Sequence, residues 1–236
     1  MLSGIALKQP GGREFSFAAA GVAIGAFLVA AAQPFAPFGG DIASGALRAA
    51  LFFAMGMCGI FLSAQVGLQC WTDDWSRTWR AAFASALGVT AFVIISDNFV
   101  FRNTLSPSYA RFLHQPLEIR LDFFAVRAYT ENIVYRLFAV PLLVLAFGRL
   151  WHKQDGSPAD GVFWTAILLA QVVNIGWNVL HFGPVSSFGL GYDSIRYVLP
   201  GLVWGYLFWR YGFVTAEIAH ILTHLLLQPA FSIFYR

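Results

Sequence analysis

Ionisable side chains lie at three places within or at the ends of the long apolar segments of this 236-residue chain, and these side chains could carry chemistry. The first place is the stretch from Tyr129 to Arg136, where Glu131 and Arg136 enter a run that continues LFAVPLLVLAF. A charge at the middle of a bilayer costs at least about 2.5–3.5 kcal/mol on insertion scales. An embedded carboxylate or guanidinium is therefore a candidate functional group.

Within this first motif, the two charged residues need not pair with each other. Glu131 and Arg136 are five residues apart, which separates them by about 140° around a helix. Asn132 and Arg136 are four residues apart and share a helix face. Because an unpaired buried guanidinium is costly, we expect Arg136 to hydrogen-bond Asn132 and to find a carboxylate, either Glu131 or Asp193. The alternative to a functional site is a structural polar contact between helices.

Two further motifs contain histidines in or at the end of apolar segments. Trp177 and His181 are four residues apart where the fifth apolar segment ends, a position at which histidine is commonly interfacial. Glu217, His220 and His224 share one face of the last apolar helix. Two imidazoles one turn apart can bind a metal together or donate hydrogen bonds to an oxyanion. They can also be core histidines whose hydrogen bonds are satisfied.

The elements that must position these residues are apolar helices. The chain is 58% hydrophobic and 11% charged, with a mean hydropathy of +0.64, whereas soluble domains carry about 25% charged residues. Apolar runs occupy Phe15–Ala32, Ala46–Leu68, Ala81–Val100, Leu121–Phe147, Val162–Val179, Ile195–Phe208 and Phe213–Leu227. Because only helices satisfy this much backbone in lipid, we predict an all-α polytopic membrane bundle of about six to eight transmembrane helices. Residues 1–236 are expected to form a single integral membrane domain.

Charge and cysteine content narrow the possible functions. A formal net charge of +3 without a basic stripe argues against nucleic-acid binding, so the expected environment and partner is the lipid bilayer. Arginines in nearly every connector leave the membrane orientation open. The first run follows Lys8 and Arg13 as a signal peptide would, but we expect it to remain as a span because many spans follow. Cys58 is expected in the core, and a disulfide with Cys70 has no support.

Several polar stretches are expected to lie outside the spans. Charged residues from Glu118 to Arg127 alternate with apolar ones, which is typical of an interfacial amphipathic helix with solvated charges. The glycine- and serine-rich stretch Phe182–Ser194 is expected to be a connector. His114 and His152 lie in polar connectors, where we expect them to be exposed.

In this order, the three motifs resemble those of the CPBP family, which comprises CAAX-type prenyl endopeptidases and bacteriocin-processing or bacteriocin-immunity membrane proteases. The family pattern is Glu-Glu-x3-Arg, then Phe-x3-His, then His-x3-Asn or His-x3-Asp, on separate transmembrane helices. The matching motifs of this chain are Glu131-Asn132-x3-Arg136, Trp177-x3-His181 and His220-x3-His224. The resemblance covers about residues 118–230, and the N-terminal half matches only as generic membrane helices.

The resemblance implies a glutamate- and histidine-dependent intramembrane endopeptidase. Glu131 would take a proton from the attacking water, and His181 would orient that water. His220 and His224 would stabilise the oxyanion, and we expect no metal to be required. This chain departs from the family pattern at three positions. Asn132 stands where the family has its second glutamate, Trp177 where it has phenylalanine, and His224 where it has asparagine or aspartate.

The same residues allow other functions. A zinc protease would use the same pocket, with three imidazoles and one carboxylate drawn from His181, His220, His224 and either Glu131 or Glu217. A non-enzymatic scaffold or immunity protein of the same fold would bind a partner there without cutting it. A histidine-box desaturase needs more histidines than the five present. A transporter would show helix breaks in two matching halves, which the sequence lacks.

The expected substrate is a peptide, or the C-terminal tail of a protein that is lipidated or otherwise anchored in the membrane. A prenylated substrate would require a eukaryotic or engineered setting. Because compact chains of this type resemble bacterial ones more often, the expected location is a cell membrane, with the bacterial inner membrane favoured.

Overall fold

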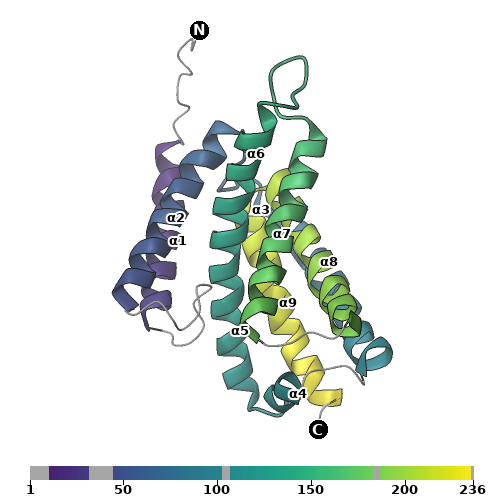
Figure 1. The fold of residues 1–236 in the computed structure, drawn as a ribbon. Coiled ribbons are helices and arrows are strands. Elements are labelled where there is room, and N and C mark those ends of the chain that lie inside the picture. Colours follow the sequence, from purple (N-terminus) through teal and green to yellow (C-terminus); the bar gives the residue numbers. More distant parts are fainter. Residues whose placement is uncertain (1–10, 32–44, 103–106, 183–186, 235–236) are drawn as a thin grey trace.

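The computed structural model describes residues 11–31, 45–102, 107–182 and 187–234, without the side chains of 107–108, 177–182, 187–190 and 193. These ranges are almost entirely helical (Figure 1). The β-type pairing within them is limited to an isolated bridge between His152 and Pro158. The predicted all-α fold is therefore confirmed.

The helices run between two ends of the molecule. In chain order they are α1 (Gly12–Ala31), α2 (Gly45–Gln65), α3 (Trp75–Ile95), η1 (Ser96–Val100), α4 (Pro107–Leu113), α5 (Leu117–Glu131), η3 (Asn132–Ala139), α6 (Val140–Gly148), α7 (Asp160–Phe182), α8 (Ser187–Tyr211) and α9 (Phe213–Phe234). The segments η1 and η3 are π-helical, and each continues the helix before it. As a result, α5, η3 and α6 form one continuous helix through the bundle (Figure 1).

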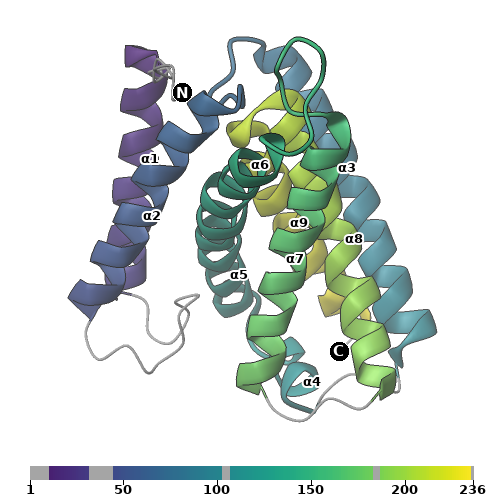
Figure 2. The same cartoon turned by 45° about the horizontal axis from the view of Figure 1, so that its top comes forward.

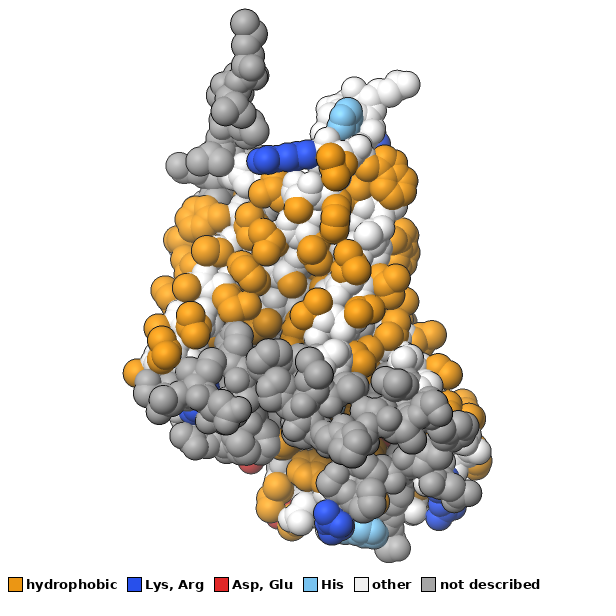
Figure 3. Space-filling model, in the orientation of Figure 1, with side chains coloured by type: hydrophobic (Ala, Val, Ile, Leu, Met, Phe, Trp, Pro, Cys, Tyr) orange, Lys and Arg blue, Asp and Glu red, His pale blue; other side chains and the backbone are white. Residues whose placement is uncertain are grey.

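A broad hydrophobic surface covers the middle of the bundle on the face shown in Figure 3. Figure 3 shows a band of hydrophobic side chains on one face, with lysine, arginine and histidine toward the two ends of that face. Large apolar side chains lie outside the core, such as Phe27 at 71% exposed and Phe99 at 72%. Helices long and apolar enough to cross a bilayer are Gly12–Ala31, Gly45–Gln65, Trp75–Val100 and Leu117–Gly148. Apolar surface of this extent is unfavourable in water, so the chain is a membrane protein, as the sequence predicts.

The helices pack as two groups around α5–η3–α6. The pair α1 and α2 lies along one side of this long helix, and α3, α7, α8 and α9 lie on the other side (Figure 1, Figure 2). Hydroxyl groups join α3 to α9. The Thr78 and Thr215 Oγ1 atoms are 3.2 Å apart, and Thr90 Oγ1 donates to the Thr223 carbonyl at 3.3 Å. Such interhelical hydrogen bonds contribute about 0.6–2 kcal/mol in lipid, so they anchor α9, which carries the third motif.

Neither π-helical segment is predicted by the apolar pattern. In η1, the Phe101 N–H bonds the Ser96 carbonyl at 2.8 Å, which is an i→i+5 contact. In the helix that contains η3, Pro141 has no N–H to offer the Leu137 carbonyl, so regular α-helical bonding is interrupted there. Single-turn π segments inside helices are frequent at functional sites. Both segments in this chain carry buried polar side chains.

A one-residue turn joins α8 to α9. Gly212 has φ of +94°, in the left-handed region that favours glycine. Its N–H bonds the Phe208 carbonyl at 3.1 Å, and a Cβ at this position would lie 3.2 Å from the Trp71 carbonyl oxygen. Two features therefore require glycine at position 212: the positive backbone angle and the close approach of the α2–α3 connector.

The charged stretch that begins at Glu118 is helical and continues directly into the rest of the long helix. Arg120 is only 2% exposed, and its guanidinium donates to the Ser232 hydroxyl of α9. The expected solvation of this charge is therefore wrong. Arg127 also differs from expectation, because it forms an ion pair with Glu131.

Two further expectations about boundaries and burial are wrong. Helix α8 begins at Ser187, so most of the expected connector before residue 195 is helical, and residues 183–186 lie outside the described ranges. Cys58 is exposed on α2 rather than buried in the core. His114 and His152 are exposed, as the sequence predicts.

The connector between α2 and α3 is held to the start of α1. The Glu14 carboxylate accepts hydrogen bonds from the Cys70 N–H at 2.6 Å and the Trp71 N–H at 3.4 Å. Burial, together with the charge of Glu14, raises the pKa of the Cys70 thiol to about 12. This thiol is therefore protonated at neutral pH, and both cysteines are free.

Replacing Gly59 with alanine is expected to loosen the contact between α2 and η3. A Cβ at Gly59 would lie 2.7 Å from the Leu137 carbonyl carbon and 3.0 Å from the Phe138 nitrogen, which are backbone atoms that cannot rotate away. Overpacking of this kind costs roughly 1–3 kcal/mol. Thermal unfolding in detergent micelles should therefore show a lower midpoint for Gly59→Ala.

The matched control for this prediction is Gly88→Ala. Gly88 is also helical, and a Cβ there would meet nothing within 4 Å. This variant should unfold at the wild-type midpoint or slightly above it, since alanine has the higher helix propensity. Equal midpoints for the two variants would show that α2 does not pack closely on η3.

Candidate functional site

The segment η3 and the last helix α9 bring together polar side chains from two of the three sequence motifs. His220 Nδ1 lies 3.2 Å from Asn132 Oδ1. The indole of Trp204, on α8, stacks on the His220 ring with centroids 3.5 Å apart. The Arg136 guanidinium lies over the same indole, 5.1 Å from its centroid. With Glu217, which precedes His220 by three residues on α9, these residues form what we call the buried polar cluster.

Every member of the buried polar cluster is almost fully buried, with Asn132 at 0% exposed and the most exposed members at 8%. Several polar atoms of the cluster nevertheless have no hydrogen-bond partner in the described ranges. They are Nδ2 of Asn132, Nε and Nη1 of Arg136, Nε1 of Trp204 and both carboxylate oxygens of Glu217. Leaving a buried polar group unsatisfied costs about 1–3 kcal/mol. Polar groups retained at such a cost are candidates for function rather than for stability.

Arg136 does not make the hydrogen bond expected from its spacing to Asn132. The Asn132 Oδ1 atom is bonded to His220 instead, and the guanidinium packs on an aromatic ring. Arg136 is 2% exposed, so it points neither into lipid nor into water. The carboxylates that interact with its charge are Glu131 and Glu217, and the side chain of the other expected partner, Asp193, is not described.

Glu131 is the more accessible of these two carboxylates. Its Oε1 accepts from Arg127 Nε at 2.7 Å, and its side chain is 16% exposed. Within the described part of the chain, no hydrogen bond or ion pair joins Glu131 to His220 or His224. This ion pair lies one residue before Asn132, the first member of the buried polar cluster along the chain.

His224 extends the buried polar cluster along α9. Its ring lies 5.2 Å from that of His220, at an interplanar angle of 38°. On its other side it stacks on Phe124 of α5, with centroids 4.6 Å apart. Its Nδ1 is buried and has no hydrogen-bond partner among the described residues. Two neighbouring imidazoles held between aromatic rings can contact the same water or the same developing oxyanion.

The side chains of the second motif, Trp177 and His181, are not among those that the structure describes. The backbone of α7 is helical through both residues. Among the residues that are described, no three histidine, cysteine, aspartate or glutamate side chains come together as metal ligands would.

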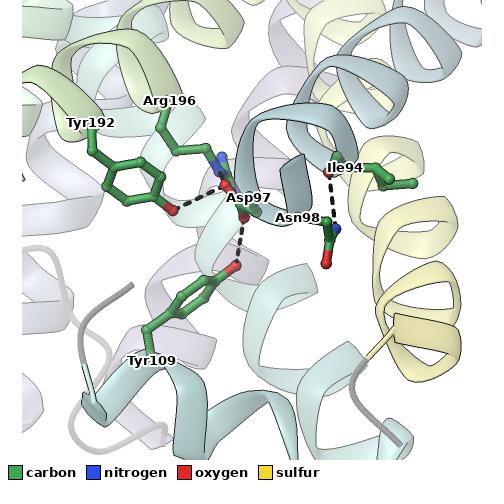
Figure 4. Close-up of polar contacts among 6 residues, drawn as sticks. All are labelled: Ile94, Asp97, Asn98, Tyr109, Tyr192 and Arg196. Atoms are coloured by element: carbon green, nitrogen blue, oxygen red, sulfur yellow. Dashed lines mark hydrogen bonds and ion pairs between the residues drawn. The ribbon is translucent and has the colours of Figure 1, made fainter. Parts of the chain in front are cut away.

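A second buried polar group lies at η1 (Figure 4). Asp97 is 0% exposed, and its carboxylate accepts from Arg196 Nε at 3.1 Å. It also accepts from the hydroxyls of Tyr192 at 3.0 Å and Tyr109 at 3.4 Å. Because both oxygens of this carboxylate are satisfied, we assign the group a structural role: it holds α8 and α4 to the end of α3.

The sequence analysis missed Asp97, although the rule applied to Glu131 could have found it, since Asp97 is also an acidic residue inside an apolar segment. Gln171 and Asn174 of α7 were missed as well, and each is 6% exposed. A Cβ at Gly201 would collide with the Gln171 amide, so α7 and α8 are in close contact there. Gln171 and Asn174 are thus buried polar groups of α7, which packs on α8.

The likeness of the chain to the CPBP family consists of the three motifs described above. Comparison of the whole chain with protein-family models, with curated proteins and with solved structures gives no match.

Proposed function

We propose that the chain is a membrane-embedded endopeptidase that cleaves a peptide or the C-terminal tail of a membrane-associated protein. The observation that carries the proposal is the pair of neighbouring imidazoles of His220 and His224 at a buried junction of α5, η3, α8 and α9. A carboxylate is supplied by Glu131, which directly precedes Asn132 on the long helix. This combination of base and hydrogen-bond donors is what the hydrolysis of an amide requires.

In the proposed reaction, Glu131 takes one proton from water as the water oxygen bonds to the substrate carbonyl carbon. The carbonyl oxygen becomes an oxyanion, which His220 and His224 stabilise. His181, the histidine of the second motif, is proposed to orient the water. The proton then passes from Glu131 to the leaving nitrogen as the C–N bond breaks, which regenerates the ionised carboxylate.

The proposal is tested with the purified chain in lipid nanodiscs. A mixed peptide library and a set of membrane-anchored reporter peptides serve as substrates, and mass spectrometry identifies new peptide termini. New termini are expected with the wild-type chain and not with empty nanodiscs. The same preparation of Glu131→Gln controls for contaminating proteases. Absence of cleavage of every anchored and soluble peptide would favour the second candidate, a non-enzymatic scaffold or immunity protein that binds a partner in the same pocket.

A metal-dependent version of the same activity has one feature in its favour. Imidazoles one turn apart on a helix, as His220 and His224 are, can bind zinc together. We nevertheless propose that no metal is required, because Glu131, the carboxylate that would complete a zinc site, is paired with Arg127.

Exhaustive chelation is therefore expected to leave peptide cleavage by the purified chain unchanged. Metal content, measured in parallel by mass spectrometry, should be well below one zinc per chain. Stoichiometric zinc, with cleavage lost on chelation and restored by added zinc, would replace the metal-free mechanism with a zinc-dependent one. A cell membrane, with the bacterial inner membrane favoured, is the proposed location for either mechanism.

A further inference from the structure

A cavity of about 440 Å³ lies where the start of α1 meets the connector between α2 and α3. Its lining includes one arginine, Arg13, two acidic residues, Glu14 and Asp73, and the aromatic residue Trp71. The volume falls within the range of about 300–1,000 Å³ that is typical of sites for small molecules. The proposed endopeptidase reaction uses none of these residues.

We propose that this cavity binds the headgroup of a phospholipid that carries a primary ammonium group, as phosphatidylethanolamine does. The headgroup phosphate would contact Arg13, and the ammonium would contact the carboxylates of Glu14 and Asp73. The inference does not rest on the proposed endopeptidase activity.

The first step of the argument concerns charges of both signs that line one cavity without pairing. No ion pair joins Arg13 to Glu14 or Asp73, although all three lie on its lining. Glu14 is held in place, because its Oε1 accepts from the N–H groups of Cys70 and Trp71. A ligand with a single sign of charge would be attracted to one of these groups and repelled by another. A zwitterion matches both, through charge-assisted hydrogen bonds from guanidinium to phosphate and from ammonium to carboxylate.

The second step concerns the position of the cavity at the end of the helices. The start of α1 and the α2–α3 connector lie at the same end of the bundle (Figure 2). Trp71 contacts Trp75 edge to face, with centroids 5.4 Å apart, and Trp75 and Trp79 are exposed. Exposed tryptophans are typical of the level at which lipid headgroups lie. Further along α1, Phe17 and Ile24 are exposed apolar side chains that acyl chains can cover, so the cavity fits a phospholipid better than a soluble zwitterion.

The third step concerns the type of ammonium group. A quaternary ammonium, as in choline, has no N–H to donate and is bound by cages of aromatic faces. One face of Trp71 is already covered by Phe17, which stacks on it with centroids 4.5 Å apart and an interplanar angle of 11°. A primary ammonium has three N–H donors, which the carboxylates of Glu14 and Asp73 can accept. The lining therefore favours ethanolamine over choline.

The experiment is native mass spectrometry of the full-length chain in detergent micelles, with lipids of identical acyl chains added at equal concentration. The lipids are phosphatidylethanolamine, its N-methyl and N,N-dimethyl derivatives, phosphatidylcholine and phosphatidylglycerol. Retention should fall as each N–H is replaced by a methyl group, with about tenfold between phosphatidylethanolamine and phosphatidylcholine, as expected when hydrogen bonds to charged groups are lost. Phosphatidylglycerol, which has the phosphate but no ammonium, should be retained no better than phosphatidylcholine. Equal retention of phosphatidylethanolamine and phosphatidylcholine, or strongest retention of phosphatidylglycerol, would overturn the proposal.

Two variants at exposed residues separate the two halves of the headgroup. Asp73→Asn should reduce the preference for phosphatidylethanolamine over phosphatidylcholine to about threefold or less, because the ammonium loses a charged acceptor. Arg13→Gln should lower the retention of both lipids alike, because both carry the phosphate. The matched controls are Asp122→Asn and Arg149→Gln, at exposed residues that do not line the cavity, and they should bind as the wild-type chain does. All four variants should keep the wild-type thermal midpoint, and an unchanged preference in Asp73→Asn would exclude the cavity as the site.

A final measurement distinguishes the lipid from a soluble ligand of the same chemistry. Free phosphoethanolamine should displace the bound lipid only at a large molar excess, on the order of a hundredfold or more, because it lacks the acyl chains that cover α1. Displacement at equal concentration would identify a soluble zwitterion as the ligand and overturn the assignment to a phospholipid.

Discussion

Replacing Glu131 with glutamine is expected to abolish peptide cleavage while the fold stays intact. Glutamine has nearly the same shape but cannot take a proton from water. Loss of a general base lowers the rate of a reaction by about 10²- to 10⁴-fold, and we expect a loss in this range for Glu131→Gln. The variant also loses the ion pair with Arg127, which is partly buried, but the glutamine carbonyl can still accept the hydrogen bond from Arg127 Nε, so the fold is expected to hold. The rate of release of new termini in nanodiscs, set beside the thermal unfolding midpoint, separates the two effects.

The matched control is Glu118→Gln, at an exposed glutamate in the first turn of the same helix. This variant should cleave at the wild-type rate and unfold at the wild-type midpoint. If Glu131→Gln cleaved as fast as Glu118→Gln, Glu131 would not be the base, and the non-enzymatic scaffold would become the favoured function.

Replacing Arg196 with methionine is expected to give the largest loss of stability. It leaves the Asp97 carboxylate fully buried with only two tyrosine hydroxyls as donors. Removing one partner of a buried ion pair costs about 3–5 kcal/mol, because the remaining charge is uncompensated. Denaturant unfolding in mixed micelles, followed by tryptophan fluorescence, should show a corresponding drop in the free energy of unfolding.

Two controls test whether the uncompensated charge is the cause. Arg80→Met, at an exposed arginine of α3, should change the free energy of unfolding by less than about 0.5 kcal/mol. The double variant Asp97→Leu with Arg196→Met removes both charges and should recover most of the lost stability. A double variant as unstable as the single one would show that the packing of Arg196, rather than its charge, holds α8 to η1.

The two expected losses arise from different parts of the interior. Asp97 and Arg196 form a closed arrangement in which both carboxylate oxygens are bonded, so its disruption should lower stability first (Figure 4). The buried polar cluster around His220 has open donors and acceptors, so changes there should alter chemistry more than stability. A variant can be assigned to one or the other by comparing its cleavage rate with its unfolding midpoint.

The sequence by itself determined which long apolar segments are helical and that Glu217, His220 and His224 share a face. Both are local properties, since a helix in lipid must satisfy its own backbone and its side chains repeat with a fixed period. The long apolar runs therefore predicted the fold class, and the turn at Gly212 agreed with the shortest connector.

Only the tertiary structure decided which polar side chain meets which. Arg136 packs on Trp204 instead of bonding Asn132, and Arg120 is buried by its contact with Ser232, although local spacing predicts neither. Such contacts join residues that are far apart in the chain, and they depend on how each helix is rotated and how closely its neighbours approach. In the π-helical segments each carbonyl accepts from the N–H five residues later, instead of four as in an α-helix. This change turns the side chains that follow by an angle that the regular helical period does not predict.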